Sequence, residues 1–225
     1  MPTWSYAPSP NLTFASERVL SLHVLRHPSC SRASDEICGQ LDPPLDALGL
    51  NDTQSIVRWW LRSGPRVQAI VASDLIRCRD LATALSQSLS VPAFFDWRLR
   101  EQSFGRWEGQ RWSELTLFDA LATAVWHNPW SARPPEGECL ADVADRVRQW
   151  WDSLVRETSL TQLAVVTHAG PLRLLTAGAL GLPTTELLRL APVAPSYTEL
   201  TFSTSGGVLS CFGTRPWATH EQPHR

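Results

Sequence analysis

Two arginines, two histidines and one glutamate in this sequence have side chains suited to phosphoryl chemistry: Arg26, Arg77, His27, His168 and Glu101. Each guanidinium offers a planar fork of N–H donors and a permanent charge, which match the oxygens of a phosphoryl group. A neutral imidazole can attack phosphorus and form a phosphohistidine, and a second imidazole can stabilise charge on the equatorial oxygens. A carboxylic acid can protonate the leaving oxygen. Together these groups make a phosphoryl-transfer site, and the sequence shows no obvious cluster to hold a metal ion.

The elements that would position these residues follow from the pattern of apolar residues. Short apolar runs predict buried strands at 21–25, 67–72, 92–98 and 162–167. Longer segments between them predict helices at 46–62, 77–89, 140–157 and 171–182, and residues 197–202 and 208–212 predict a hairpin around Ser205-Gly206-Gly207. The alternation predicts an α/β fold, a three-layer α/β/α sandwich with a mostly parallel (mixed) sheet.

The candidate residues stand at or just beyond the predicted strand ends. In such sheets ligands bind outside the carboxyl ends of the strands. Each residue alone has a plain structural explanation: a solvated helix face for Arg77, a surface ion pair for Glu101, or a helix start for His168. Their joint placement at one sheet edge favours a common site instead.

The chain is expected to form one domain with an insertion. Trp-rich helical patches over 105–138 are broken by Asn128-Pro129 and by Arg133-Pro134-Pro135, which predicts an inserted helical subdomain within a single domain over 19–213. Residues 1–18 are expected to be a flexible N-terminal tail, and residues 214–225 a C-terminal tail. The first sixteen residues lack the charged and apolar regions of a signal peptide.

Composition excludes several classes of protein. All 20 basic residues are arginines, so Schiff-base and P-loop lysine chemistry are excluded. A net charge of −2 and a pI near 6.3 argue against a nucleic-acid binder. Five cysteines without a C-x-x-C pair fit neither a zinc site nor a disulfide scaffold, so reduced thiols are expected. No apolar run reaches the roughly 18 residues of a membrane helix, and we expect a cytoplasmic protein without membrane partners.

Five segments in order resemble the motifs of the histidine phosphatase superfamily, also called the phosphoglycerate mutase-like family. The resemblance covers about residues 20–212. The first segment resembles L-R-H-G, the second S-x-L-x-R-[AC], the third the stretch that carries the acid, the fourth P-x-G-E-S and the fifth V-S-H-G-G. In this sequence they are Leu25-Arg26-His27, Ser73-Asp-Leu-Ile-Arg77-Cys-Arg, Arg100-Glu101 to Gly109, Pro135-Glu-Gly137-Glu138-Cys139 and Val166-Thr167-His168-Ala169-Gly170.

The resemblance implies a role for each candidate residue and a phosphoglycerate mutase-like fold. His27 takes the place of the phosphorylated nucleophile, Glu101 that of the general acid, and His168 that of the second phosphate-pocket histidine. The catalytic set is therefore His27, Glu101 and His168, and the phosphate-binding set Arg26, Arg77 and His168. The implied activity is a phosphomonoesterase that acts on a small-molecule phosphate monoester and needs no metal ion or cofactor.

Within the superfamily, Arg26-His27-Pro28 and the run from Ile37 to Leu45 are similar to alpha-ribazole phosphatases of cobalamin biosynthesis, and the run Phe104-Gly105-Arg106-Trp107-Glu108-Gly109 points the same way. The implied substrate is alpha-ribazole 5′-phosphate or its adenosylcobalamin counterpart. Several residues depart from the family pattern. Pro28 replaces a glycine and fixes φ at about −65°, although its carbonyl remains available to orient His27. Cys30 and Ala33 occupy the places of polar phosphate-binding residues, and Ala169 replaces a glycine. Gly39 directly follows Cys38, where the family pattern has an aromatic residue between the two. These departures bear on substrate preference more than on chemistry.

Three alternatives remain open beside this reading: a phosphatase of another small phosphorylated metabolite, a phosphoglycerate mutase, and a non-catalytic module that binds a phosphorylated ligand. Only 67 residues separate Glu101 from His168 (168 − 101), whereas the mutases of the family keep a longer insertion there. The absence of lysine also disfavours a bisphosphate. A non-catalytic binding module could lose members of this catalytic set and still function, so the intact set disfavours that alternative.

Overall fold

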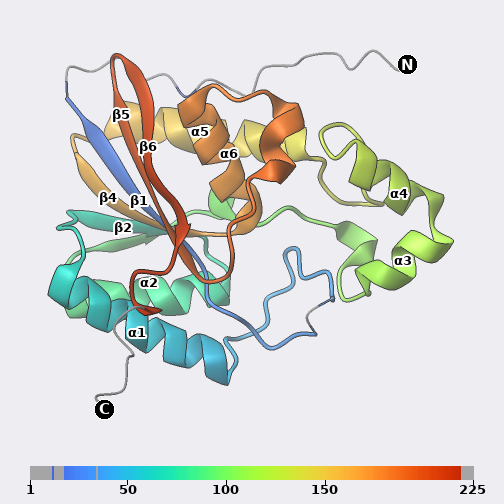
Figure 1. The fold of residues 1–225 in the computed structure, drawn as a ribbon, viewed down its shortest axis with the longest axis horizontal. Helices are drawn as coiled ribbons and strands as arrows, with labels where there is room; N and C mark the ends of the chain where they lie inside the picture. Colours follow the sequence, from blue (N-terminus) through green and yellow to red (C-terminus); the bar gives the residue numbers. More distant parts are fainter. Residues whose placement is uncertain (1–11, 13–17, 34, 219–225) are drawn as a thin grey trace.

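A six-stranded sheet forms the centre of the computed structural model, which describes residues 12, 18–33 and 35–218 (Figure 1). β1 to β4 are parallel to one another, whereas β5 pairs antiparallel with β1 and β6 antiparallel with β5. The predicted mixed sheet is therefore confirmed, while most of both predicted tails lies outside the described residues. In pairing order the strands are β3 (Ala93–Phe95), β2 (Ala69–Ala72), β4 (Gln162–Thr167), β1 (Leu20–Arg26), β5 (Ser196–Ser203) and β6 (Gly206–Thr214).

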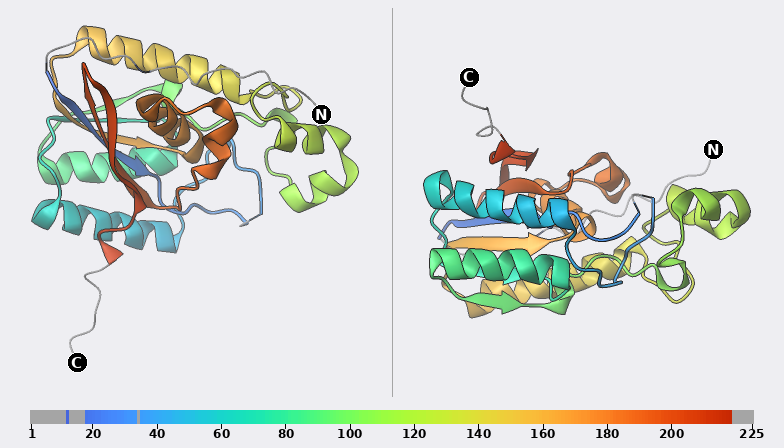
Figure 2. Two further views of the ribbon diagram at one scale, coloured as in Figure 1. Left: turned by 45° about the horizontal axis from the view of Figure 1, so that its top comes forward. Right: turned by 90° about the horizontal axis from the view of Figure 1, so that it is seen from below.

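Helices cover both faces of this sheet, so the three-layer prediction is also confirmed. Figures 1 and 2 show α1 and α2 on one face and α5 and α6 on the other. Among the described residues, no helix is long and apolar enough to cross a membrane. The helices are α1 (Ala47–Ser63), α2 (Ile76–Leu89), α3 (Trp112–Phe118), α4 (Ala120–His127), α5 (Leu140–Glu157) and α6 (Ala169–Leu180), with 3₁₀ turns η1 (Trp97–Leu99), η2 (Gly105–Trp107) and η3 (Thr184–Arg189).

The side chains of β1 show why both faces need helices. Leu20, Leu22 and Val24 belong to the core cluster under α5 and α6, and Leu25 belongs to the cluster under α1 and α2. All four are fully buried. Successive side chains of a strand point to opposite faces, so a continuous apolar run is stable only when both faces are covered.

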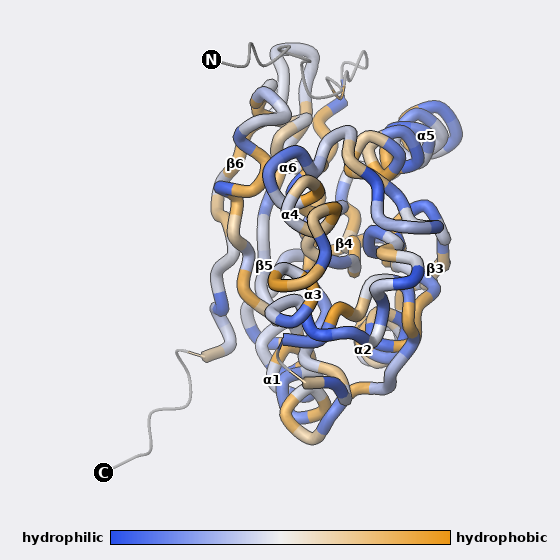
Figure 3. The backbone as a smooth tube through the Cα atoms, turned by 90° about the vertical axis from the view of Figure 1, so that its right-hand side faces the viewer, coloured by the Kyte–Doolittle hydropathy of each residue, from blue (hydrophilic) through white to orange (hydrophobic). Residues whose placement is uncertain are grey.

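Residues 105–138 lie apart from the sheet. α3 and α4 project beyond the carboxyl ends of β1, β2 and β4, and this arrangement is visible in all views of the ribbon (Figures 1 and 2). Figure 3 looks onto this end and shows hydrophobic residues along α4. These helices share a small core of their own, in which Trp107, Leu115, Ala122 and Val125 are buried together with Ile37. The region can therefore form a wall over the strand ends.

Several elements differ from their predicted ranges by one to three residues at an end, and two of the differences bear on the site. The strand predicted at 92–98 is limited to Ala93–Phe95, because Asp96 accepts a hydrogen bond from the N–H of Arg98 and starts the turn η1. The helix predicted at 171–182 begins at Ala169 instead. It ends at Leu180 because Gly181 adopts the left-handed conformation (φ 64°) that terminates helices.

Candidate active site

The predicted site residues meet around one cavity at the carboxyl ends of the parallel strands. The cavity has a volume of about 290 Å³, and we refer to it as the strand-end cavity. Arg26 and His27 reach it from the end of β1, Arg77 from the first turn of α2, and Glu101 from the loop after η1. His168 follows β4 and is fully buried against the ring of His27. The structure thus brings all five residues together.

His27 is held in one orientation by the backbone. Its Nδ1 lies 2.6 Å from the carbonyl oxygen of Pro28. A carbonyl only accepts, so Nδ1 carries the proton and Nε2 keeps a free lone pair. Burial, together with the positive charges of Arg77 and Arg26, holds the pKa of His27 well below its usual value. The ring is therefore neutral at physiological pH, the state in which an imidazole is a nucleophile.

His168 packs directly against His27. The two ring centroids are 4.9 Å apart, and Nε2 of His168 lies 2.9 Å from the Ser73 hydroxyl oxygen. Burial lowers the pKa of His168 well below its usual value, and the neighbouring His27 and Arg77 add to the effect. The Cys78 thiol, 3.4 Å from the same nitrogen, completes the surroundings of the ring.

The two arginines each keep a donor free. Arg77 is 1% exposed and donates one N–H to the carbonyl of Leu41 and another to that of Gly39, both at 2.7 Å. Arg26 donates to the carbonyl of Pro192 at 2.5 Å. The buried Nε of each arginine has no hydrogen-bond partner within the described structure. Both arginines line the cavity, and their permanent charges favour an anion within it.

Glu101 is fixed at the start of α6. Its Oε1 accepts hydrogen bonds at 3.0 Å from the backbone N–H of Gly170 and from that of Gln102. These two hydrogen bonds hold the side chain of Glu101 against the N-terminal end of α6. This contact explains why α6 begins before Pro171, where the sequence pattern placed it.

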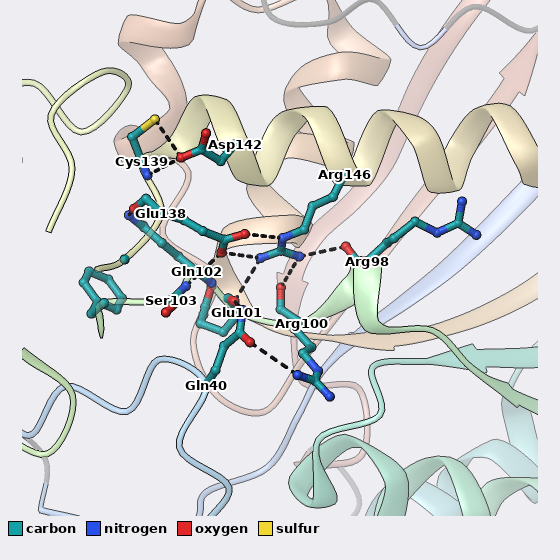
Figure 4. A network of polar contacts seen from close by, with 12 residues as sticks. Gln40, Arg98, Arg100, Glu101, Gln102, Ser103, Glu138, Cys139, Asp142 and Arg146 are labelled. Atoms are coloured by element: carbon teal, nitrogen blue, oxygen red, sulfur yellow. Dashed lines mark hydrogen bonds and ion pairs between the residues drawn. The ribbon is translucent and has the colours of Figure 1, made fainter. Parts of the chain in front are cut away.

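A buried arginine of α5 supports the segment that carries Glu101 (Figure 4). Arg146 is 4% exposed and donates to the carbonyls of Arg98, Arg100 and Glu101 at 2.6–2.9 Å. It also forms an ion pair with Glu138 at 2.9 Å. The sequence analysis did not single out Arg146, because an arginine in an amphipathic helix usually lies at the surface.

Much of the rest of the cavity lining is apolar. It includes Phe104, Trp112, Val125 and Trp126 of the inserted region and Leu140 at the start of α5. Two further arginines, Arg32 and Arg173, also line the cavity. Burial lowers the pKa of Arg173, and the charge of Glu101 opposes that effect. The cavity can therefore hold an apolar group and a second anionic group beside a phosphate.

In the part of the chain that the structure describes, His, Cys, Asp and Glu side chains nowhere gather in threes as a metal site would require.

Comparison with known proteins assigns this sequence to a family. The sequence profile of the histidine phosphatase superfamily (branch 1) matches residues 22–214. Glucosyl-3-phosphoglycerate phosphatase of Mycolicibacterium vanbaalenii is 33% identical over 74% of this chain and 76% of its own. Adenosylcobalamin/alpha-ribazole phosphatase of Salmonella typhimurium is 30% identical over 66% of this chain and 73% of its own. The solved structure of a mycobacterial glucosyl-3-phosphoglycerate phosphatase superimposes with a TM-score of 0.77 at 25% identity, covering 88% of this chain and 100% of that one.

Proposed function

This chain belongs to the histidine phosphatase superfamily and is a phosphatase of small phosphorylated substrates, and we propose that it works without a metal ion through a phosphohistidine on His27. Glu101 acts as the general acid, and Arg26, Arg77 and His168 bind the phosphoryl group. The observation that carries the proposal is the orientation of His27, whose Nδ1 donates to Pro28 and whose Nε2 is left as the free base.

In the first step, Nε2 of His27 attacks phosphorus while the bond from phosphorus to the ester oxygen breaks. The leaving oxygen takes a proton from the carboxylic acid of Glu101 and departs as an alcohol. The arginines and His168 stabilise the charge on the equatorial oxygens during transfer. Arg26 and Arg77 are suited to this, because both line the cavity and carry permanent positive charges.

In the second step, water attacks the phosphohistidine. The Glu101 carboxylate takes a proton from that water as the bond between phosphorus and Nε2 breaks. The products are inorganic phosphate, a neutral His27 and a protonated Glu101, which returns the site to its starting state. The low pKa of His27 supports this step, because a neutral imidazole is the form that is regenerated.

For the substrate we propose alpha-ribazole 5′-phosphate, which places the protein in cobalamin biosynthesis in the cytoplasm. The motifs around His27 and Phe104 and the relatives named adenosylcobalamin/alpha-ribazole phosphatase support this choice. The rings of Phe104, Trp112 and Trp126 also fit it, since flat aromatic surfaces stack favourably on an aromatic base.

A second candidate is glucosyl-3-phosphoglycerate, the substrate in the name of the 33% identical relative. Arg32 and Arg173, which also line the cavity, favour it, because they could pair with the carboxylate of such a substrate. A phosphoglycerate mutase is a third candidate, supported by a probable phosphoglycerate mutase of Shigella boydii that is 29% identical over 87% of this chain. The short stretch between Glu101 and His168 favours transfer to water over transfer to a second hydroxyl.

The test is hydrolysis of alpha-ribazole 5′-phosphate against sugar, glycerate and nucleotide monophosphates, with EDTA present throughout. We expect the highest kcat/KM for alpha-ribazole 5′-phosphate. Preference for glucosyl-3-phosphoglycerate would keep the chemistry and replace the substrate, and isotopic exchange between 2- and 3-phosphoglycerate would establish the mutase instead.

The mechanism is tested with His27→Ala and, as a matched control, with the exposed His127→Ala on α4. We expect His27→Ala to lose nearly all turnover and to form no acid-labile phosphoenzyme, while His127→Ala remains unchanged. A His27→Ala variant that keeps more than a few per cent of the activity would exclude the covalent route.

A further inference from the structure

Glu108 is a carboxylate that joins two loops of the site. It directly follows the turn η2 in the inserted region and is partly buried. Its Oε1 accepts a hydrogen bond from the backbone N–H of Gln40 and another from that of Phe104, both at 2.9 Å. The Ser103 hydroxyl donates to the same oxygen at 3.4 Å. Two segments that are distant in the sequence therefore meet at one atom.

The first of these segments orients a phosphate-binding arginine. Gln40 lies between Gly39 and Leu41, whose carbonyls each accept a hydrogen bond from the Arg77 guanidinium at 2.7 Å. Gly39 also packs closely against the Glu108 side chain, because a Cβ built on Gly39 would overlap Oε1 and Cδ of that carboxylate. A shift of the Glu108 carboxylate therefore moves the acceptors that hold Arg77 in the strand-end cavity.

The second segment carries the general acid and part of the cavity lining. Ser103 and Phe104 follow Glu101 closely in the chain, and Phe104 lines the strand-end cavity. The side-chain amide of Gln40 also donates to the carbonyl of Glu101 at 3.2 Å, so the two segments touch at a second point. Because Oε1 of Glu108 binds both backbones, it holds the loop that orients the phosphate-binding arginine against the segment of the acid.

We propose that Glu108 is a positioning residue, which holds Arg77 and Glu101 in register with each other. The inference rests on the proposed function, in which Arg77 binds the phosphoryl group and Glu101 protonates the leaving oxygen. Hydrogen bonds to a carboxylate are shorter and stronger than those to a neutral acceptor, so one oxygen can hold two backbone segments. Misplacement of a catalytic group by about 1 Å costs on the order of 10²-fold in rate, so the register matters for turnover.

Three substitutions separate the reach of this side chain from its charge. Glu108→Gln keeps an acceptor oxygen in the same place and loses the charge, whereas Glu108→Asp keeps the charge and is shorter by one methylene group. Glu108→Ala removes both. We expect Glu108→Ala and Glu108→Asp to lower kcat/KM by on the order of 10²-fold, and Glu108→Gln to retain most of the wild-type value. Glu114→Ala, which removes an exposed acid on α3, is the matched control and should leave kcat/KM unchanged.

Binding of inorganic phosphate to the same proteins, measured by calorimetry, reports on Arg77 without any turnover. We expect Glu108→Ala and Glu108→Asp to weaken phosphate binding by on the order of tenfold, since the loop that orients the guanidinium is no longer fixed. A merely structural role for Glu108 would lower the free energy of unfolding in urea and leave the phosphate affinity of the folded protein unchanged.

Gly39→Ala perturbs the same junction from its other side. Gly39 has a φ of 51°, so an alanine there is strained whatever its neighbours are. In a double-mutant cycle with Glu108→Ala that strain cancels, and the cycle isolates the overlap between the new Cβ and the carboxylate. We expect the loss of phosphate affinity in the double variant to be smaller than the product of the two single losses.

Wild-type phosphate affinity in both Glu108→Ala and Glu108→Asp would overturn the proposal, and so would equal losses in Glu108→Gln and Glu108→Ala. If Glu108→Ala does not fold, the comparison of Glu108→Gln with Glu108→Asp decides by itself. A wild-type protein that binds phosphate and hydrolyses no ester would contradict the proposed function alone, because the ratios of phosphate affinity still test Glu108. Absence of phosphate binding by the wild type would overturn both.

Discussion

At Gly170 the absence of a side chain is what leaves room for the acid. A Cβ built there would lie 2.4 Å from Oε1 of Glu101, and no backbone atom is nearer to it than 4.0 Å. We therefore expect Gly170→Ala to displace the Glu101 carboxylate and to lower kcat/KM by on the order of 10²-fold. The melting temperature should not fall, because only a flexible side chain has to move and alanine favours helix.

The control for Gly170→Ala is the same substitution in a Glu101→Gln background. If Gly170 acts through Glu101, the second substitution adds little to the first, and the double-mutant cycle shows strong coupling. Independent, multiplying effects of the two substitutions would contradict this role of Gly170.

The general-acid role of Glu101 predicts a dependence on the leaving group. Glu101→Gln should lower kcat/KM on sugar or glycerate phosphates by about 10²–10⁴-fold, the usual contribution of a general acid. The loss should be much smaller on p-nitrophenyl phosphate, whose leaving oxygen needs no proton. The ratio of kcat/KM on the two esters measures this, because kcat/KM excludes the later hydrolysis of the phosphoenzyme. Equal losses on both esters would show that Glu101 serves binding instead.

At the scale of elements, α5 keeps the acid-bearing segment in place through one side chain. Arg146→Met would leave Glu138 and three backbone carbonyls without their shared donor. Breaking a buried ion pair on one side costs about 3–5 kcal/mol, so we expect a fall of that order in the free energy of unfolding measured with urea. We also expect a lower kcat, since Glu101 belongs to the loosened segment.

Arg148→Met is the matched control on the same helix, because Arg148 pairs with Asp145 at the surface. An exposed pair contributes only about 0–1 kcal/mol. If Arg146→Met destabilised the protein no more than Arg148→Met, the network in Figure 4 would not be what holds the Glu101 segment.

The elements differ in how well local patterns predicted them. Residues 162–167 and 140–157 match β4 and α5 to the residue, because a fully buried strand and a one-sided helix each impose a clear apolar period. The start of α6 was predicted two residues late, since the contact between Gly170 and Glu101 is made across the fold. β3 was predicted too long because Phe94 and Phe95 resemble a buried strand, although both are exposed at the sheet edge.

The same distinction applies to the site. Arg26, His27, Arg77, Glu101 and His168 were found because parallel strands end at one edge, a rule that needs only the order of elements. The places of Arg146 and Arg173 depend on how loops and helices pack in three dimensions. No periodicity in the sequence encodes such contacts, so the structure was needed to find them.

For the molecule as a whole, neutral histidines are part of the packed interior. His23, His27 and His168 are all at least 93% buried, since their exposed fractions are 3%, 7% and 0%. Burial is the largest cause of the lowered pKa of each. In the unfolded chain these rings regain the usual value of about 6.5. Protonation therefore favours the unfolded chain over the folded one.

The sign of the resulting pH dependence follows from proton counting. Between the lowered pKa values of the folded state and 6.5, the unfolded state binds more protons, so the free energy of unfolding rises with pH. The full contribution is present above 6.5 and is lost as the pH falls below it. We expect the urea midpoint of unfolding to fall as the pH is lowered from about 7.5 to about 5.5. His23 lies outside the strand-end cavity, and we expect His23→Gln to make that fall smaller. The exposed His127→Gln should leave the slope unchanged, and an equal flattening by both variants would mean that buried histidines are not its source.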